Sequence, residues 1–291
     1  MPSPKLGPSD KEHPSVRPSA WFIIVQELFH WMLISGVVGA VITVSASSAQ
    51  LGGVARSSFD SWSLLAAVAV ASFVLLWTVR SKLGAKIFGA LFALTIFSGV
   101  FTAASVLFGL GAAVIVSAAA ILLYYNNPRV VVFDLILSFG LAGIAASIGF
   151  GFQPVALLVV LAVLSAYDIA AVYLTGHMVK LGKALLRRKV FFAMILAERP
   201  RGLLCPLGGV TPGTDFVFLG TGDLVLPALL VSSAAASGGW SAAVSVAVGA
   251  AIGLAATHVI FITQRIRKPM AALPPIAAGA MLGYAFAIIM A

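Results

Sequence analysis

Two aspartates in the sequence are spaced for acid–base chemistry within an apolar environment. Asp168 lies near the end of one long apolar segment, and Asp223 lies near the start of the next. At 1.5 Å of helical rise per residue, both carboxyl groups are predicted at about 9–10 Å from the same membrane surface. Two carboxylates a few Å apart cannot both ionise easily, so one can take a proton from water while the other protonates a carbonyl oxygen. The pattern predicts hydrolysis by an aspartate pair.

The residues around Asp223 favour this interpretation. Gly220 and Gly222 precede it in Gly220-Thr221-Gly222-Asp223. Because they have no side chains, the backbone there is bare, and water or a substrate strand can approach closely. Pro227 removes the helical hydrogen bond to the Asp223 carbonyl. The helix is therefore expected to be loosened at the acid.

Other ionisable residues also fall within apolar segments, where they are costly and count as functional candidates. Glu27 and His30 are three residues apart and are expected to form an internal polar pair or hydration site. Asp134 is expected to pair with Arg129 or another basic residue near the interface, and His258 is expected to be a hydrogen-bonded packing residue. One Glu-x-x-His does not make a di-iron site, and no His/Cys cluster has zinc spacing. No metal or cofactor is expected.

The composition sets the class of protein. Of 291 residues, 61% are hydrophobic, 9% are charged and only nine are acidic. A soluble domain carries roughly 25% charged residues, so the chain is predicted to be an all-α polytopic membrane protein. The single cysteine, Cys205, excludes an internal disulfide and is interpreted as an inert thiol.

Apolar runs and their breaks predict nine transmembrane helices. Gly109 and Gly111 are expected to mark one turn, and Ser237-Gly238-Gly239 another. The chain is divided into a disordered cytoplasmic tail (1–20), a six-helix bundle (21–174), a basic cytoplasmic loop (175–215) and a three-helix part (216–291). The predicted spans are 21–45, 63–79, 86–107, 110–125, 130–150, 154–174, 216–235, 241–262 and 270–290.

The charge distribution predicts the orientation. With nine spans, every basic residue except Arg56 falls on the side of the N-terminus. The positive-inside rule then places the N-terminus in the cytoplasm and the C-terminus outside. The net charge of +9 is accounted for by a basic face against anionic lipid, without a nucleic acid partner.

These features together resemble the presenilin and signal peptide peptidase family of intramembrane aspartyl proteases. That family has Tyr-Asp in its sixth span, Gly-x-Gly-Asp in its seventh and Pro-Ala-Leu at its ninth. Tyr167-Asp168 matches the first motif, and Gly220-Thr221-Gly222-Asp223 matches the second. Ala271-Ala272-Leu273-Pro274 matches the third except for Ala271, which replaces the first proline. The literal Pro227-Ala228-Leu229 lies in the seventh span and is interpreted as a coincidence. The compact chain resembles an archaeal homologue of presenilin.

The resemblance implies that the chain cleaves peptide bonds within transmembrane segments. Asp168 and Asp223 would be catalytic, and the substrate would be a membrane protein or peptide in the bilayer of a prokaryotic cell. The site would be shaped by Tyr167, Gly220, Thr221 and Gly222, and the substrate would be positioned by Ala272, Leu273 and Pro274. An unwound substrate strand is expected to pair with backbone near Leu273 or before span seven. Self-association stays open.

Two other functions remain open from the residues. A proton-coupled transporter could use Asp168, Asp223 and Glu27 as a relay, but that function does not account for the flanking glycines. A prepilin-type peptidase also uses Gly-x-Gly-Asp, but its second acid usually lies in a cytoplasmic-side loop. Asp215, just before the seventh span, does not fit that order.

Overall fold

The computed structural model describes residues 19–47, 84–174, 193–210, 215–264 and 269–290, together with four isolated residues between 62 and 70. The predicted span 63–79 and the possible interfacial helix at 185–192 lie almost wholly outside this part of the chain. The helices are α1 (Ser19–Ser47), α3 (Gly84–Phe108), α4 (Leu110–Asn126), α5 (Val130–Gly151), α6 (Pro154–Ile169), α8 (Thr221–Thr263) and α9 (Leu273–Met290).

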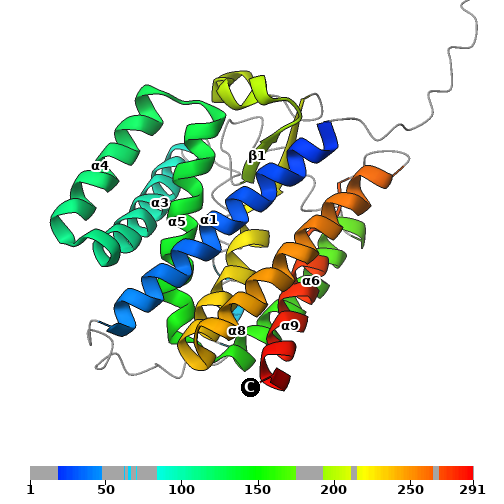
Figure 1. Cartoon of the computed structure of the whole chain (residues 1–291). Helices are drawn as coiled ribbons and strands as arrows, with labels where there is room; N and C mark the ends of the chain where they lie inside the picture. Colours follow the sequence, from blue (N-terminus) through cyan, green and yellow to red (C-terminus); the bar gives the residue numbers. More distant parts are fainter. Residues whose placement is uncertain are drawn as a thin grey trace, which may run out of the picture.

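Glycines end the helices at the predicted turns. Gly109 separates α3 from α4 with a φ of 84°, a conformation that favours glycine. Gly239 has a φ of 73° and interrupts α8, which is 43 residues long. At 1.5 Å per residue that helix would measure about 65 Å, roughly twice the apolar thickness of a bilayer. Gly239 instead divides α8 into two arms, coloured yellow and orange in Figure 1.

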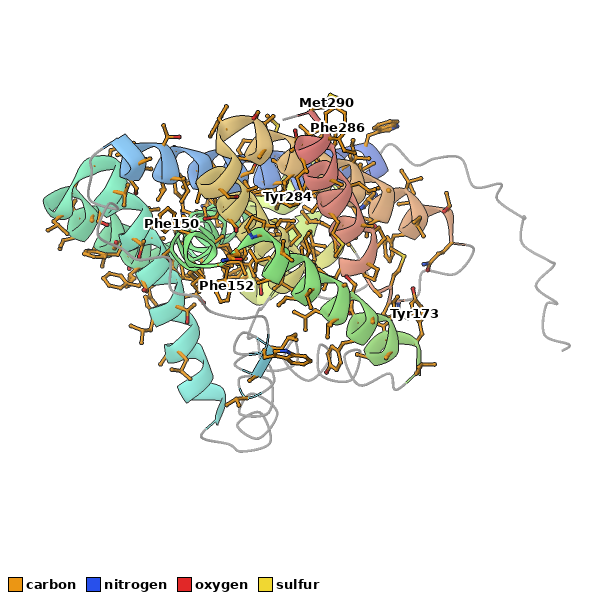
Figure 2. All side chains as sticks on the ribbon, turned by 90° about the horizontal axis from the view of Figure 1, so that it is seen from below. Phe150, Phe152, Tyr173, Tyr284, Phe286 and Met290 are labelled. Atoms are coloured by element: carbon orange, nitrogen blue, oxygen red, sulfur yellow. The ribbon has the colours of Figure 1, made fainter. Side chains whose placement is uncertain are left out.

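Five of the described helical segments are long and apolar enough to cross a membrane: α1, α5, α6 with its extension to Leu174, α8 and α9. α3 and α4 contribute shorter apolar stretches, Ala93–Phe108 and Leu110–Asn126. The count of nine spans therefore stays a prediction. Large apolar side chains on the periphery are consistent with contact to lipid, and Figure 2 shows Phe286 and Met290 on the outer side of α9.

α1, α5 and α8 pack against one another at the centre of the described bundle, and α8 has its most extensive contact with α9. Polar side chains join these helices. The Trp31 indole N–H donates to the Ala247 carbonyl at 2.9 Å, and the Ser233 hydroxyl donates to the Phe152 carbonyl at 2.6 Å. Such bonds and close packing hold transmembrane helices together, because lipid provides no hydrophobic drive between them.

The region before α8 differs from the prediction. Residues 216–220, expected as the start of a helix, form strand β2 (Phe216–Gly220), which pairs antiparallel with β1 (Ala193–Ala197). Two short 3₁₀-helices, η2 (Pro200–Leu204) and η3 (Leu207–Gly209), lie between the strands. The predicted helical start at residue 216 is wrong because a second apolar run within the loop offers a pairing partner. A depth for Asp223 counted by helical rise from that start therefore does not hold.

Candidate active site

Asp223 lies in the first turn of α8, not within a continuous helix. Gly220 is the residue that caps this helix, and its backbone N–H donates to the Asp223 carboxylate. A carboxylate three residues after the cap that reaches back to the cap N–H is half of a capping box. The positive end of the helix dipole also stabilises negative charge at this position. The start of the helix thus fixes the orientation of the side chain.

Asp168 is positioned by α6 and by the start of α9. Its Oδ2 accepts a hydrogen bond from the Leu273 backbone N–H at 3.3 Å. Two residues after Asp168, the α-helix gives way to a π-helix, Ala170–Leu174. π-Helical turns inside helices are frequent at functional sites. The sequence had predicted one regular helix over 154–174 and did not reveal this change.

Asp168 and Asp223 lie on α6 and α8, which pack against each other. The two carboxylates interact electrostatically, and both residues are half-buried. Each has its own backbone donor, Leu273 for Asp168 and Gly220 for Asp223. Elements far apart in sequence, α6, α8 and α9, therefore contribute to one acidic site. Such a pair can share a proton and act on a water molecule as acid and base.

Gly220 and Gly222 differ in their surroundings. A Cβ added to Gly220 would lie 2.9 Å from Oδ2 of Asp223, which is too close for a relaxed contact. A Cβ added to Gly222 would meet no described atom within 4 Å. A glycine at position 220 therefore leaves room for the Asp223 carboxylate, and the described residues leave the space beside Gly222 unfilled.

The remaining predicted residues lie around this site. Tyr167 is 50% exposed, and Thr221 is the first residue of α8. The carbonyl of Ala272 accepts a hydrogen bond from the Thr257 hydroxyl at 3.5 Å, just before α9 begins at Leu273. Pro274 lies in the first turn of α9, where a missing N–H costs no helical hydrogen bond.

The predicted pairing of Glu27 with His30 is wrong. Oε1 of Glu27 lies 3.2 Å from Nδ1 of His258, whereas a hydrogen bond joins His30 Nδ1 to Ser138 Oγ at 3.0 Å. The two side chains on α1 share a helical face, but α8 and α5 pack against different parts of it. His258 is hydrogen-bonded and buried, as predicted.

Asp134 does not pair with Arg129. Its Oδ1 accepts the backbone N–H of Ile195 in β1 at 3.0 Å. Arg129 caps α5 with extended backbone and forms a β-bridge with Pro206, so its main chain is directed to the loop. Gln26, which the sequence did not single out, also contacts β1. The only indication in the sequence was that Gln26 is a polar residue within an apolar span.

Within the described ranges, no group of three or more His, Cys, Asp or Glu residues could hold a metal ion. Cys205 is a half-buried free thiol there.

Comparison with known proteins agrees with this geometry. Residues 31–291 match the family described as signal-peptide peptidase, presenilin aspartyl protease. Two crystal forms of a presenilin family intramembrane aspartate protease have a similar fold. The C222 form gives a TM-score of 0.64 at 23% identity, covering 93% of this chain and 99% of that chain. The P2 form gives 0.63 at 21% identity, covering 92% and 98%. No curated protein matches the sequence. The family match covers most of the chain, including both aspartates, and the chain therefore belongs to the signal-peptide peptidase and presenilin family of intramembrane aspartyl proteases.

Proposed function

We propose that Asp168 and Asp223 are the catalytic pair with which this aspartyl protease hydrolyses peptide bonds inside transmembrane segments. The observation that carries this proposal is the electrostatic interaction between the two carboxylates, on helices α6 and α8 that pack against each other and against α9. Neither the proton-relay function nor the prepilin-type function accounts for the family match over residues 31–291.

In the proposed mechanism the pair holds one proton. The ionised carboxylate accepts a proton from water, which attacks the scissile carbonyl carbon, and the protonated carboxyl donates to the carbonyl oxygen. The Leu273 and Gly220 N–H groups keep the two carboxyl groups in fixed orientations. Fixed orientation lowers the barrier because the reacting groups need not be reorganised.

The substrate helix must unwind before its carbonyl can react, because a helical carbonyl is hydrogen-bonded within the helix. β2 runs directly into the first turn of α8, where Asp223 lies. A substrate strand lying alongside β2 would bring its carbonyl groups to the aspartate pair. No atom of the described part of the chain lies within 4 Å of a Cβ placed on Gly222, which favours close approach of a second backbone.

The decisive test is cleavage of a synthetic transmembrane substrate in proteoliposomes by the wild-type chain and by the Asp168→Asn and Asp223→Asn variants. Asparagine keeps the size of the side chain but cannot act as the acid or the base. We expect each variant to lose product below detection while its thermal unfolding stays close to wild type. Cleavage by either single variant at more than about one-hundredth of the wild-type rate would exclude that aspartate from general acid–base chemistry.

We further propose the orientation with a cytoplasmic N-terminus, an outside C-terminus and nine spans, in the cell membrane of a prokaryote. The separation of all basic residues except Arg56 onto one side supports this orientation. Transmembrane proteins or peptides are the substrates that such a site would receive from the bilayer.

A further inference from the structure

We propose that Gln26 and Asp134 are positioning residues that close the inner edge of the two-stranded sheet against a further strand and hold β1, and through it β2, in place. Neither residue touches the aspartate pair. They act through β1, which holds β2, and β2 leads into Asp223. This inference rests on the proposed function only for its cleavage readout.

The side chain of Gln26 bonds to β1 as a neighbouring strand would. Its Oε1 accepts the Ala197 N–H at 3.2 Å, and its Nε2 donates to the Ala197 carbonyl at 2.8 Å. An amide side chain has the same donor and acceptor groups as a peptide unit. Gln26 is only 7% exposed, and its Nε2 also donates to the Phe22 carbonyl in α1 at 3.1 Å. The strand is thereby tied to α1.

Asp134 contacts the same strand two residues earlier, as an acceptor only. Its Oδ1 accepts the Ile195 N–H at 3.0 Å, and the residue is 1% exposed. Alternate residues of a strand direct their backbone groups to the same edge. Ile195 and Ala197 are two residues apart, so α5 and α1 cap consecutive positions on a single edge of β1.

The opposite edge of β1 is occupied by β2. The register pairs Met194 with Leu219 and Leu196 with Val217, and the Glu198 N–H donates to the Asp215 carbonyl at 2.8 Å. The backbone groups of Met194, Leu196 and Glu198 therefore face β2. With both edges of β1 used, an added strand has no place on the inner side of the sheet.

Burial explains why these caps are needed. The side chains of Met194, Ile195, Leu196 and Ala197 are fully buried, so water cannot satisfy the inner N–H and carbonyl groups of β1. A buried backbone group without a partner costs about 1–3 kcal/mol. Without Gln26 and Asp134, a shift in the register of β1 or fraying of its ends would lower the free energy, because the unpaired backbone groups could then find partners or water. Either change would move β2 relative to Asp223.

The test uses apolar replacements of similar size, Gln26→Met and Asp134→Leu, with Asp134→Asn as the conservative variant that keeps an acceptor for Ile195. Ser138→Ala is the matched control, because it removes a buried contact between the same two helices, that with His30, without touching β1. All four are also made in the inactive Asp223→Asn background. Hydrogen exchange of the 193–197 amides can then be measured without any dependence on proteolysis.

We expect Gln26→Met and Asp134→Leu to speed exchange of the 193–197 amides by at least about tenfold. We expect the same variants in the active chain to spread cleavage over neighbouring peptide bonds of the substrate, as read by mass spectrometry. Asp134→Asn should leave both the exchange rates and the cleavage positions close to those of the wild type. Ser138→Ala should lower the unfolding temperature without changing either readout.

Unchanged exchange in Gln26→Met would overturn the proposal, and so would equal spreading of cleavage in Ser138→Ala. If Asp134→Leu fails to fold, Gln26→Met decides alone. A wild-type chain that cleaves nothing would contradict the proposed function, but the exchange measured in the inactive background would still decide whether the two side chains hold β1.

Discussion

Asp168 and Asp223 are the same residue type, but their positions in the backbone differ. Asp223 is held at the beginning of a helix by Gly220, whereas Asp168 lies near the end of a helix and accepts a hydrogen bond from Leu273. Two carboxyl groups in different environments can take the different roles of acid and base. The asymmetry of the pair therefore follows from which end of a helix each aspartate occupies.

The two site glycines give a matched pair of substitutions. Gly220→Ala puts a Cβ 2.9 Å from the Asp223 carboxylate, so the carboxylate must move. With Asp223 as the proposed catalytic group, we expect kcat to fall by roughly 100-fold, because displacement of such a group by about 1 Å has an effect of that order. The measurement is steady-state cleavage of a transmembrane substrate, with thermal unfolding to check the fold.

Gly222→Ala is the comparison, since its new Cβ would meet no described atom. We expect a loss that is smaller and appears in KM, because only the approach of substrate is obstructed. An equal fall in kcat for both variants would contradict the assignment of Gly220 as the residue in contact with the carboxylate.

Candidate site residues could be proposed from the sequence where the signal was local. Asp168, Asp223 and their flanking residues form short motifs that can be read without a fold. The partner of Glu27 could not be predicted in this way, because His258 is 231 residues away and reaches it only through the packing of α1 on α8. Asp134 was assigned to a nearby arginine for the same reason, since its actual partner is a strand within the long loop.

At the scale of elements, glycines set how closely α8 approaches α9. A Cβ on Gly249 would collide with the Gly279 carbonyl oxygen, and one on Gly283 would collide with that of Ser245. Small residues at such a crossing let two transmembrane helices approach closely. Because α9 begins at Leu273, this close packing also places the N–H that binds Asp168.

Gly279→Ala is expected to lower both stability and activity, since it forces α9 away from α8. Gly36→Ala in α1 is the control, because its Cβ would meet no atom of the described residues within 4 Å and alanine favours helix by about 1 kcal/mol. Thermal unfolding in detergent and substrate cleavage should both fall for the first variant and neither should fall for the second. A neutral Gly279→Ala would contradict the role of the crossing.

The Glu27–His258 contact links α1 to the second arm of α8 in a buried site, with 5% and 2% of the two side chains exposed. A double-mutant cycle with Glu27→Leu and His258→Leu should give a coupling energy of about 0.6–1.7 kcal/mol, the range of hydrogen bonds within membrane proteins. Reversible unfolding in mixed micelles would measure it. A coupling near zero would mean that the two side chains contribute independently.

Helices were predictable because long apolar runs separated by glycine leave few alternatives. The strands were not, since five-residue apolar runs fit either a helix or a strand. Phe216–Gly220 leads directly into α8 at Thr221, and Gly220 and Gly222 were interpreted as loosening a helix that had already begun, not as marking its start. Pairing with β1, whose residues lie 19 to 27 positions upstream of their partners, decides the outcome, and pairing depends on the three-dimensional arrangement.

For the whole molecule, the basic residues predict the orientation in the membrane. Arg201 is exposed in the loop that carries η2, and Arg56 is the single basic residue predicted on the other side. In a Cys205→Ser background, Arg201→Cys should react with a membrane-impermeant maleimide only in inverted vesicles. Arg56→Cys should react in intact cells. The reverse labelling pattern would show that the N-terminus is outside.

The count of spans can be tested in the same background. An odd number places the two ends of the chain on opposite sides of the membrane, whereas an even number places them on the same side. Nine spans therefore predict that Ser3→Cys is labelled only from the cytoplasmic side and Ala291→Cys only from outside. Labelling of both ends from one side would exclude nine, and the separation of all basic residues except Arg56 would then need a different assignment of the loops. For the proposed entry of a substrate strand alongside β2, the orientation determines which end of a transmembrane substrate enters and hence which side of the bilayer each product leaves from.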